Sequence, residues 1–394
     1  MLCINQTKII SLNSCRRLLI FILVMLLLGT AVTAQQSIDL IFHSGKIVKN
    51  YPRFPERTFS LLGSVAYNRK LNGEAIWHQF YHNPEVTFQG TFGSLGNATE
   101  FGNIHSISGG YRFIHPLNHK INLTAEARLG AAYFNHPFNE ESNIDNVTVG
   151  SSITVQATAD AGLEYRFSRW SLLAKASVLH CSNSHYSLPN VGINMPLISL
   201  GIRYSFGDSL RTSSTFKPST DKRVRYNFRL ALGINEQGGS TGPVNGPHYG
   251  VYLASFYIYR HYTPVARWQT GLEGYYNQGS YTFITSQRYY REQERLKSSA
   301  LSAILGHEYI FGHVGFVTQG GIYIYNPLGR DRYEELSEKG IRDYLKTLIS
   351  ARLGLHYYLR STFDQKRNNL FVGWYTKTNF GKADFMEMTV GYNF

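Results

Sequence analysis

The stretch SITVQATADAGLEYRF, from Ser152 to Phe167, alternates between apolar and polar side chains, with Gly162 among the polar positions. Side chains of a β-strand point alternately to its two faces, so a period of two predicts an extended strand. The apolar face holds Ile153, Val155, Ala157, Ala159, Ala161, Leu163, Tyr165 and Phe167. Because this stretch is longer than most strands of soluble proteins, we expect it to cross an apolar medium.

The same alternation recurs along the chain and at its C-terminus. It extends over 121–133, 224–232 and 349–357, and the last residues form an apolar row of one parity. That row is Met386, Met388, Val390, Tyr392 and Phe394. A soluble β-sandwich alternates as well. However, long strands with charges of both signs on their polar faces favour an antiparallel β-barrel of the outer-membrane type.

The composition agrees with such a barrel. The chain has 28 Tyr, 24 Phe and 36 Gly, whereas charged residues make up only 16% of it. Membrane barrels need aromatic girdles at both interfaces and an outer face that tolerates lipid. The net charge is +13. No basic cluster matches a nucleic-acid motif, so contact with phosphate-bearing lipid explains this excess better than nucleic acid does.

The N-terminal segment has the pattern of a cleaved secretory signal. The basic residues Lys8, Arg16 and Arg17 precede an almost wholly apolar run, 18–28. Small residues follow at 32–34, so we expect cleavage after Ala34, with an uncleaved membrane anchor as the alternative. Cys3 and Cys15 would leave with this segment, and the remaining thiol, Cys181, has no partner for an internal disulfide.

Sixteen segments are candidate strands, and an even number is usual in bacterial barrels. They are 37–45, 57–67, 84–95, 103–115, 119–134, 149–168, 169–182, 194–206, 223–235, 248–259, 266–277, 297–311, 313–325, 343–360, 368–378 and 383–394. We favour one barrel of about 14–16 strands, in which 35–206 forms the first part and 207–394 adds further strands. The alternative is two eight-stranded barrels separated by the polar link 207–222.

Two links on the expected periplasmic side are longer than a turn. These are 68–83 and 207–222, so either an extra strand lies there or the first segment is not a strand. The long links 236–247, 278–296 and 326–342 are expected outside the cell, where the loops of such barrels are longer.

A polar group interrupts the lipid-facing row of one strand. In 169–182 the even residues from Trp170 to Val178 are apolar, and His180 and Ser182 continue that row. On the next strand Asn194 has the same parity as the apolar residues that follow it. Unpaired polar groups facing lipid are costly, so three of them together predict a functional site at the extracellular end of both strands. The alternative is an ordinary polar barrel rim.

These residue types suit ester hydrolysis. A serine hydroxyl becomes a nucleophile when a base takes its proton, and histidine does this near neutral pH. A third group must hold the far imidazole nitrogen, and asparagine side chains can donate hydrogen bonds to a developing oxyanion. His180 and Ser182, two residues apart on one strand face, are close enough for this contact.

The motif resembles that of the PagL family of outer-membrane lipid A 3-O-deacylases, also described as acyloxyacyl hydrolases. The residues that carry the resemblance are His180-x-Ser182-Asn183 and Pro189-Asn190-x-Gly192-Ile193, within a matching region of about 38–206. The family has an eight-stranded barrel with a Ser-His-Glu triad on its lipid-facing outside. The resemblance implies that Ser182 is the nucleophile and His180 the general base.

Further roles follow from the same resemblance. Asn183, Asn190 and Gly192 would shape the oxyanion hole and the substrate site, and Asn194 stands where the family has the triad glutamate. Asparagine can orient the imidazole but cannot stabilise imidazolium with a charge. Cys181 has the opposite parity, so we expect it to face inward and not to replace the serine.

The expected activity is therefore hydrolysis of an ester-linked acyl chain of lipid A, with lipopolysaccharide of the outer leaflet as partner and the outer membrane as location. No cofactor is implied, and no metal site is predicted, because His105, His115 and His119 lack a ligand-like spacing. The alternative is a non-enzymatic barrel with a degenerate site that binds lipid or forms a pore.

Overall fold

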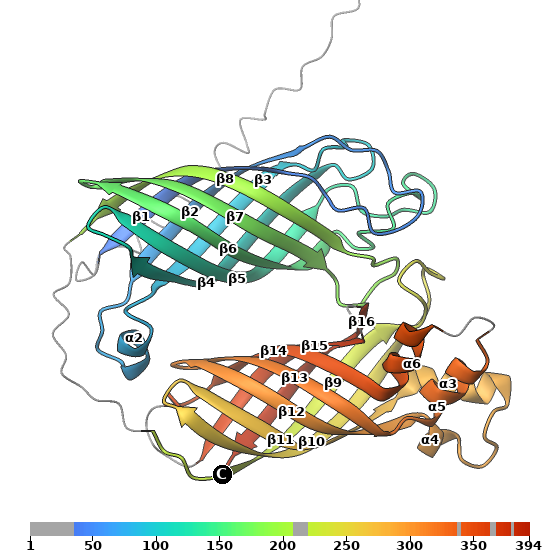
Figure 1. The fold of residues 1–394 in the computed structure, drawn as a ribbon. Coiled ribbons are helices and arrows are strands. Elements are labelled where there is room, and N and C mark those ends of the chain that lie inside the picture. Colours follow the sequence, from blue (N-terminus) through green and yellow to red (C-terminus); the bar gives the residue numbers. More distant parts are fainter. Residues whose placement is uncertain (1–34, 208–219, 337–339, 363–367, 380–381) are drawn as a thin grey trace, which may run out of the picture.

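The structure is a computed structural model that describes residues 35–207, 220–336, 340–362, 368–379 and 382–394. The expected signal segment 1–34 lies outside the described residues. Within them the chain forms sixteen strands, which close into two antiparallel barrels of eight strands each (Figure 1). None of the described helices is long and apolar enough to cross a membrane.

The first barrel closes because each strand pairs with the next and the last pairs with the first. Gln36 lies opposite Phe206, and Gly45 lies opposite Leu197, so the ring has no unpaired edge. A short helix, α2 (Ile76–Phe80), lies in the link between the second and third strands. The strands are β1 (Gln36–Gly45), β2 (Ser60–Lys70), β3 (Glu85–Ser94), β4 (Asn103–Pro116), β5 (Ile121–Phe134), β6 (Ile153–Phe167), β7 (Trp170–Ser182) and β8 (Ile193–Phe206).

The second barrel closes in the same way, with Asn227 of its first strand opposite Asn393 of its last. Its strands are β9 (Arg225–Glu236), β10 (His248–Thr263), β11 (Ala266–Asn277), β12 (Ser299–Phe311), β13 (Val314–Tyr325), β14 (Ile349–Tyr358), β15 (Asn369–Asn379) and β16 (Lys382–Asn393). Two links at one end of the barrel carry helices (Figure 1). These are α3 (Gln278–Gln287), α4 (Glu294–Lys297), α5 (Pro327–Glu334) and α6 (Ile341–Leu348).

The membrane-type barrel fold and the number of strands are confirmed, but the favoured single barrel is wrong. Each of the sixteen expected segments overlaps an observed strand, and the alternative of two eight-stranded barrels is the one observed. The expected strand 343–360 is wrong over its first residues, because 343–348 belong to helix α6 and the strand begins at Ile349. The link 68–83 contains helix α2 and no extra strand, and most of 207–222 lies outside the described residues. The period of a strand shows its two faces, whereas closure depends on which strands pair across the ring.

Charged side chains fill the interior of both barrels. In the first barrel a guanidinium nitrogen of Arg112 lies 3.1 Å from a carboxylate oxygen of Glu164, and both side chains are buried. In the second barrel the corresponding distance between Arg229 and Glu273 is 2.6 Å. Buried charges need such partners. A barrel of eight strands is narrow enough for its own side chains to occupy the lumen, so these interiors are packed cores.

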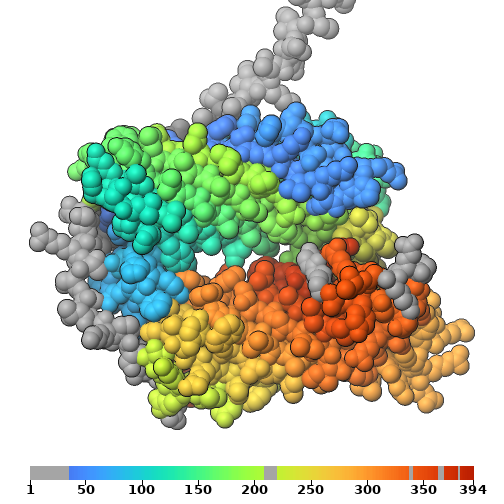
Figure 2. All heavy atoms as spheres, viewed as in Figure 1, coloured from blue at the N-terminus to red at the C-terminus, as the bar shows by residue number. Residues whose placement is uncertain are grey.

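The two barrels lie side by side and contact each other near both ends (Figure 1). At the end that carries α2, the rings of Tyr81 and Tyr111 stack on Phe311 with centroid distances of 4.9 and 4.8 Å. At the other end the link between β7 and β8 forms hydrogen bonds with residues 236–248 of the second barrel. We call this second contact the loop junction. Figure 2 shows an opening between the barrels that separates the two contacts.

Candidate active site on the outer face of the first barrel

Strand pairing brings the predicted site residues together. His180 of β7 lies directly opposite Asn194 of β8, and Ser182 follows two residues later on β7. The His180 side chain is exposed, and Ser182 and Asn194 are half-buried. Their apolar neighbours on the same face are largely exposed, with Val178 at 56% and Ile198 at 66%. The prediction that these polar groups share the outer face is therefore confirmed.

The inward-facing residues between them hold the strand ends in place. Leu179 and Cys181 of β7 and Ile193 and Met195 of β8 are at most 3% exposed and belong to one apolar cluster inside the barrel. Every second residue of both strands is thus anchored, which fixes the alternate residues on the outside. Cys181 faces inward as expected, so its thiol is directed away from the outer face that carries Ser182.

Asn194 orients the imidazole of His180. Its Oδ1 atom lies 2.8 Å from Nδ1 of His180, within hydrogen-bond distance. An amide oxygen is only an acceptor, so Nδ1 must carry the hydrogen and Nε2 is left as the basic nitrogen. This is the tautomer that a general base requires. The asparagine therefore fixes the orientation of the imidazole without placing a charge beside it.

The hydroxyl of Ser182 is held by the following loop. Nδ2 of Asn190 donates to Oγ of Ser182 at 3.0 Å, and the hydroxyl donates back to Oδ1 of Asn190 at 3.3 Å. The backbone N–H of Ser184 also points at Oγ, at 3.2 Å. In this structure Ser182 thus exchanges hydrogen bonds with Asn190, and among the described residues no hydrogen bond joins Ser182 to His180, so the contact expected from the sequence is not formed here. Catalytic hydrogen bonds are often incomplete before substrate binds.

The other two predicted residues shape the loop. The side-chain amide of Asn183 donates to the carbonyl of Ser187 at 2.7 Å, and its backbone N–H donates to Oδ1 of Asn190 at 3.2 Å. Gly192 has a positive φ of 81°. A Cβ atom there would lie 3.4 Å from Cε1 of His180 and 3.7 Å from Cβ of Ser182. Asn183 therefore fixes the loop, and Gly192 keeps the space beside both residues open.

The loop junction adds residues that sequence reasoning missed. Leu188 donates its backbone N–H to Glu236 at 2.7 Å, and Asn190 donates its own to the carbonyl of Ser240 at 2.7 Å. Both acceptors belong to the second barrel. No spacing or period connects Glu236 with the motif at 180–194, so only the tertiary structure reveals this contact.

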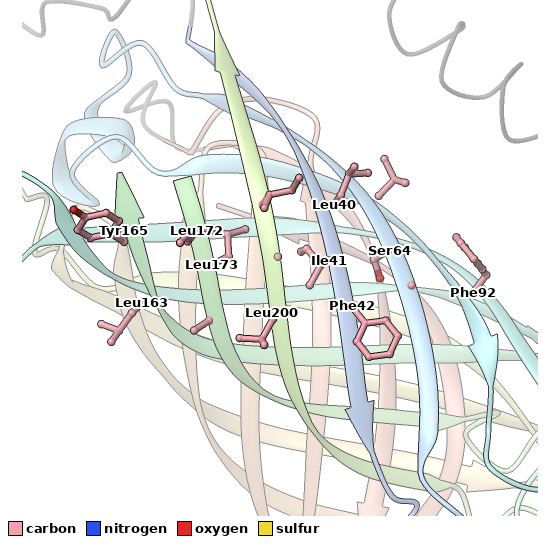
Figure 3. A pocket seen from close by; sticks show the side chains of 15 residues that line it. Leu40, Ile41, Phe42, Ser64, Phe92, Leu163, Tyr165, Leu172, Leu173 and Leu200 are labelled. Atoms are coloured by element: carbon pink, nitrogen blue, oxygen red, sulfur yellow. The ribbon is translucent and has the colours of Figure 1, made fainter. Parts of the chain in front are cut away.

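A separate apolar hollow of about 830 Å³ lies on the outer face of the first barrel. Leu40, Phe42, Leu172 and Leu200 line it, together with other residues of the surrounding strands (Figure 3). Along β7 and β8 these residues lie several positions away from His180 and Asn194, towards the other end of the barrel. An apolar outer face of this kind is the surface that membrane barrels present to lipid chains.

The fold and the outward polar group together define a β-barrel of the outer-membrane type with a candidate site on its lipid-facing side. Two family models match the chain. The model "Lipid A 3-O-deacylase (PagL)" covers residues 62–203, and "Acyloxyacyl hydrolase, C-terminal domain" covers residues 224–394. Each match falls on one barrel. The chain therefore belongs to the PagL-type family of lipid A deacylases and acyloxyacyl hydrolases.

Solved structures of single barrels resemble parts of the chain. The outer-membrane enzyme PagL is 18% identical, with 41% of this chain and 97% of that chain covered and a TM-score of 0.28. Neisserial surface protein A is 11% identical, with 44% and 97% covered and a TM-score of 0.31. The N-terminal barrel domain of Pseudomonas aeruginosa OprF is 17% identical, with 44% and 100% covered and a TM-score of 0.26. No curated protein matches the chain.

Proposed function

We propose that this protein is an outer-membrane esterase that hydrolyses an ester-linked acyl chain of lipid A, with Ser182 as nucleophile and His180 as general base. The observation that carries the proposal is the set of hydroxyl, imidazole and amide groups that face outward on β7 and β8. A site at this place meets the lipid of the outer leaflet. The family of the chain supports lipid A as the substrate.

In the proposed reaction Oγ of Ser182 attacks the ester carbonyl, and Nε2 of His180 takes the hydroxyl proton. The carbonyl oxygen gains negative charge in the tetrahedral intermediate. Nδ2 of Asn190 and the N–H of Ser184 already point at Ser182 and are the proposed donors to this oxyanion. His180 then returns the proton to the sugar oxygen that leaves. Water, activated by the same imidazole, releases the acyl chain from Ser182.

Asn194 determines how fast this reaction can be. Through its hydrogen bond of 2.8 Å it keeps Nε2 of His180 free to accept a proton. It gives no negative charge to stabilise the imidazolium that forms, so the proposed enzyme lacks one contribution that a carboxylate would supply. We propose a working but slow triad composed of Ser182, His180 and Asn194.

The alternative is a barrel that binds lipid without cutting it, and the amide at 194 is the observation that favours it. The pore-forming version of this alternative fits the structure poorly. Each described barrel has eight strands, and buried ion pairs such as Arg112–Glu164 and Arg229–Glu273 occupy the two interiors. An aqueous channel needs a larger ring of strands.

Mass spectrometry of lipid A from membranes that carry this protein tests the proposal. We expect the wild-type protein to release a hydroxy fatty acid, and Ser182→Ala or His180→Ala to abolish the release. Identical lipid A spectra for wild type and Ser182→Ala would reject the esterase.

A further inference from the structure

We propose that the second barrel is a positioning element of the active site, and that Glu236 acts through Asn190 to hold the hydroxyl of Ser182. The inference rests on the proposed esterase function and extends it to the half of the chain that carries no predicted catalytic residue. Its basis is the loop junction, where residues 185–190 of the first barrel contact residues 236–248 of the second.

Glu236 is the central residue of this junction. Its side chain is only 1% exposed, and its two carboxylate oxygens accept backbone N–H groups from two different segments. Oε2 accepts from Leu188 of the first barrel at 2.7 Å, and Oε1 accepts from Gly246 of its own barrel at 2.5 Å. The backbone N–H of Glu236 donates in turn to the carbonyl of His185 at 3.1 Å. A buried carboxylate persists when charge-assisted hydrogen bonds satisfy it, and Glu236 has that arrangement.

From Glu236 the contacts continue to the proposed nucleophile. Two residues after Leu188, the N–H of Asn190 donates to the carbonyl of Ser240 at 2.7 Å. The side chain of the same Asn190 exchanges hydrogen bonds with Ser182 at 3.0 and 3.3 Å. The backbone of Asn190 is thus held by the second barrel, while its side chain reaches the nucleophile of the first.

Other polar groups of the loop also bind the second barrel. Oγ of Ser184 lies 2.8 Å from Oγ1 of Thr376, which is on β15. Nε2 of His185 lies 3.2 Å from the carbonyl of Gly238, and the carbonyl of Tyr186 accepts from His248 at 2.8 Å. The first barrel holds the loop at Ser187, whose hydroxyl donates to the carbonyl of Gly150 at 3.1 Å. It also holds the end of the loop, where the N–H groups of 191 and 192 donate to the carbonyls of 147 and 148. Of the seven residues from 184 to 190, five form hydrogen bonds with the second barrel, namely 184, 185, 186, 188 and 190.

A small displacement of this loop would matter for the reaction. Asn190 and the N–H of Ser184 are the proposed oxyanion donors, and a shift of about 1 Å in a catalytic group can cost roughly 100-fold in rate. Such donors help only when they are fixed before the reaction begins. Because the second barrel helps to fix this loop, together with the first, we infer that the two barrels share one active site.

The test uses the full-length protein with Glu236→Gln. Glutamine keeps the size of the side chain, but its NH2 group would face one of the two N–H donors, Leu188 or Gly246. We expect kcat for release of the acyl chain from lipid A to fall by about tenfold or more, with KM nearly unchanged. The matched control is Glu294→Gln on α4 of the same barrel, which should retain wild-type kcat. A milder second variant, Thr376→Val, removes only the contact to Ser184 and should lower kcat less.

A double-mutant cycle separates positioning from general destabilisation. If Glu236 acts through Asn190, then Glu236→Gln should reduce kcat far less in an Asn190→Ala background than in the wild type. Equal effects in both backgrounds would overturn the proposed route through Asn190. Wild-type kcat for Glu236→Gln would overturn the positioning role altogether.

Hydrogen exchange distinguishes this inference from the proposed function. In detergent micelles the amides of Leu188 and Asn190 should exchange faster in Glu236→Gln than in wild type, with β6 and β7 unchanged. If they do so and no variant releases a fatty acid, the junction is supported and the esterase fails. If wild type is active and these amides exchange at the wild-type rate in Glu236→Gln, the positioning role fails and the esterase stands.

Discussion

Asn194 of β8 lies opposite His180 of β7, and its amide oxygen is 2.8 Å from Nδ1 of the imidazole. The acceptor is neutral, whereas the resemblance of the motif implies a carboxylate at this position. This hydrogen bond sets the tautomer of His180, but it leaves the protonated imidazole without a counter-charge. This relationship gives the most direct test of the proposed triad.

We predict that Asn194→Asp accelerates acyl release and that Asn194→Leu slows it. Aspartate would keep the acceptor and add a charge that stabilises imidazolium, so we expect a gain of about tenfold or more in kcat. Leucine removes the acceptor and leaves the ring unoriented. The measurement is the initial rate of fatty-acid release from lipid A in micelles. An Asn194→Asp protein no faster than wild type would contradict the assigned role of Asn194.

Asn190→Ala should lower kcat by about 100-fold or more with little change in KM, because one proposed oxyanion donor is lost. The donor is the Nδ2 atom that lies 3.0 Å from Oγ of Ser182. The control is Asn118→Ala, which lies in the turn between β4 and β5 and should retain the wild-type rate. Steady-state kinetics with purified lipid A makes the comparison. A matching loss in Asn118→Ala would point to a general effect on the barrel.

Gly192→Ala should reduce the rate of acyl release by roughly tenfold or more while the barrel still folds. The residue has a φ of 81°, and a Cβ atom would lie 3.2 Å from the carbonyl oxygen of Cys181 and 3.4 Å from the His180 ring. Backbone strain at the positive φ and crowding by the added methyl group would both displace the imidazole of His180. Gly90→Ala is the control, because a Cβ there meets no atom within 4 Å. Folding is checked by the heat-dependent gel mobility of both variants.

The loop junction should weaken in acid because of His185. Burial lowers the pKa of His185 below its ordinary value, since the charged imidazole is poorly solvated there. Asp384 and Glu236 oppose this shift, and Lys382 adds to it. The unfolded loop therefore binds the proton more readily than the folded loop. The neutral ring of His185 stabilises the loop junction at a pH above its ordinary pKa of roughly 6.5. This stabilisation is lost progressively as the pH falls below that value.

Hydrogen exchange of the amides at 185–190, measured as a function of pH and corrected for intrinsic rates, checks this expectation. Protection should decrease between about pH 7 and pH 5 in the wild type. His185→Gln keeps a side-chain donor for the carbonyl of Gly238 and should remove most of that dependence. An unchanged pH profile in His185→Gln would assign the effect to another group.

Much of the fold was predictable because membrane strands alternate strictly. The period of two located all sixteen strands, including β7 and β8, and the parity of His180, Ser182 and Asn194 placed them on the outer face. One face of each strand meets lipid and the other meets a packed interior, so a shift by one residue would expose charges to lipid. Local sequence therefore determines both the strands and the side on which the site lies.

The closure of the sheet was not predictable in this way. Whether β8 pairs with β1 or continues to β9 leaves the alternation of every strand unchanged. The decision depends on hydrogen bonds between segments more than a hundred residues apart and on how the interior charges pair, as Arg203 does with Asp39. These relationships have no local period that a reading of the sequence can detect.

The sequence by itself determined that this chain is a membrane-type barrel protein whose serine, histidine and asparagine face outward together. Only the tertiary structure decided that there are two barrels and that Glu236 of the second holds the loop beside Ser182 of the first. The physical reason is the range of the interactions. Alternation arises within one strand, whereas barrel closure and the loop junction arise from contacts between distant parts of the chain.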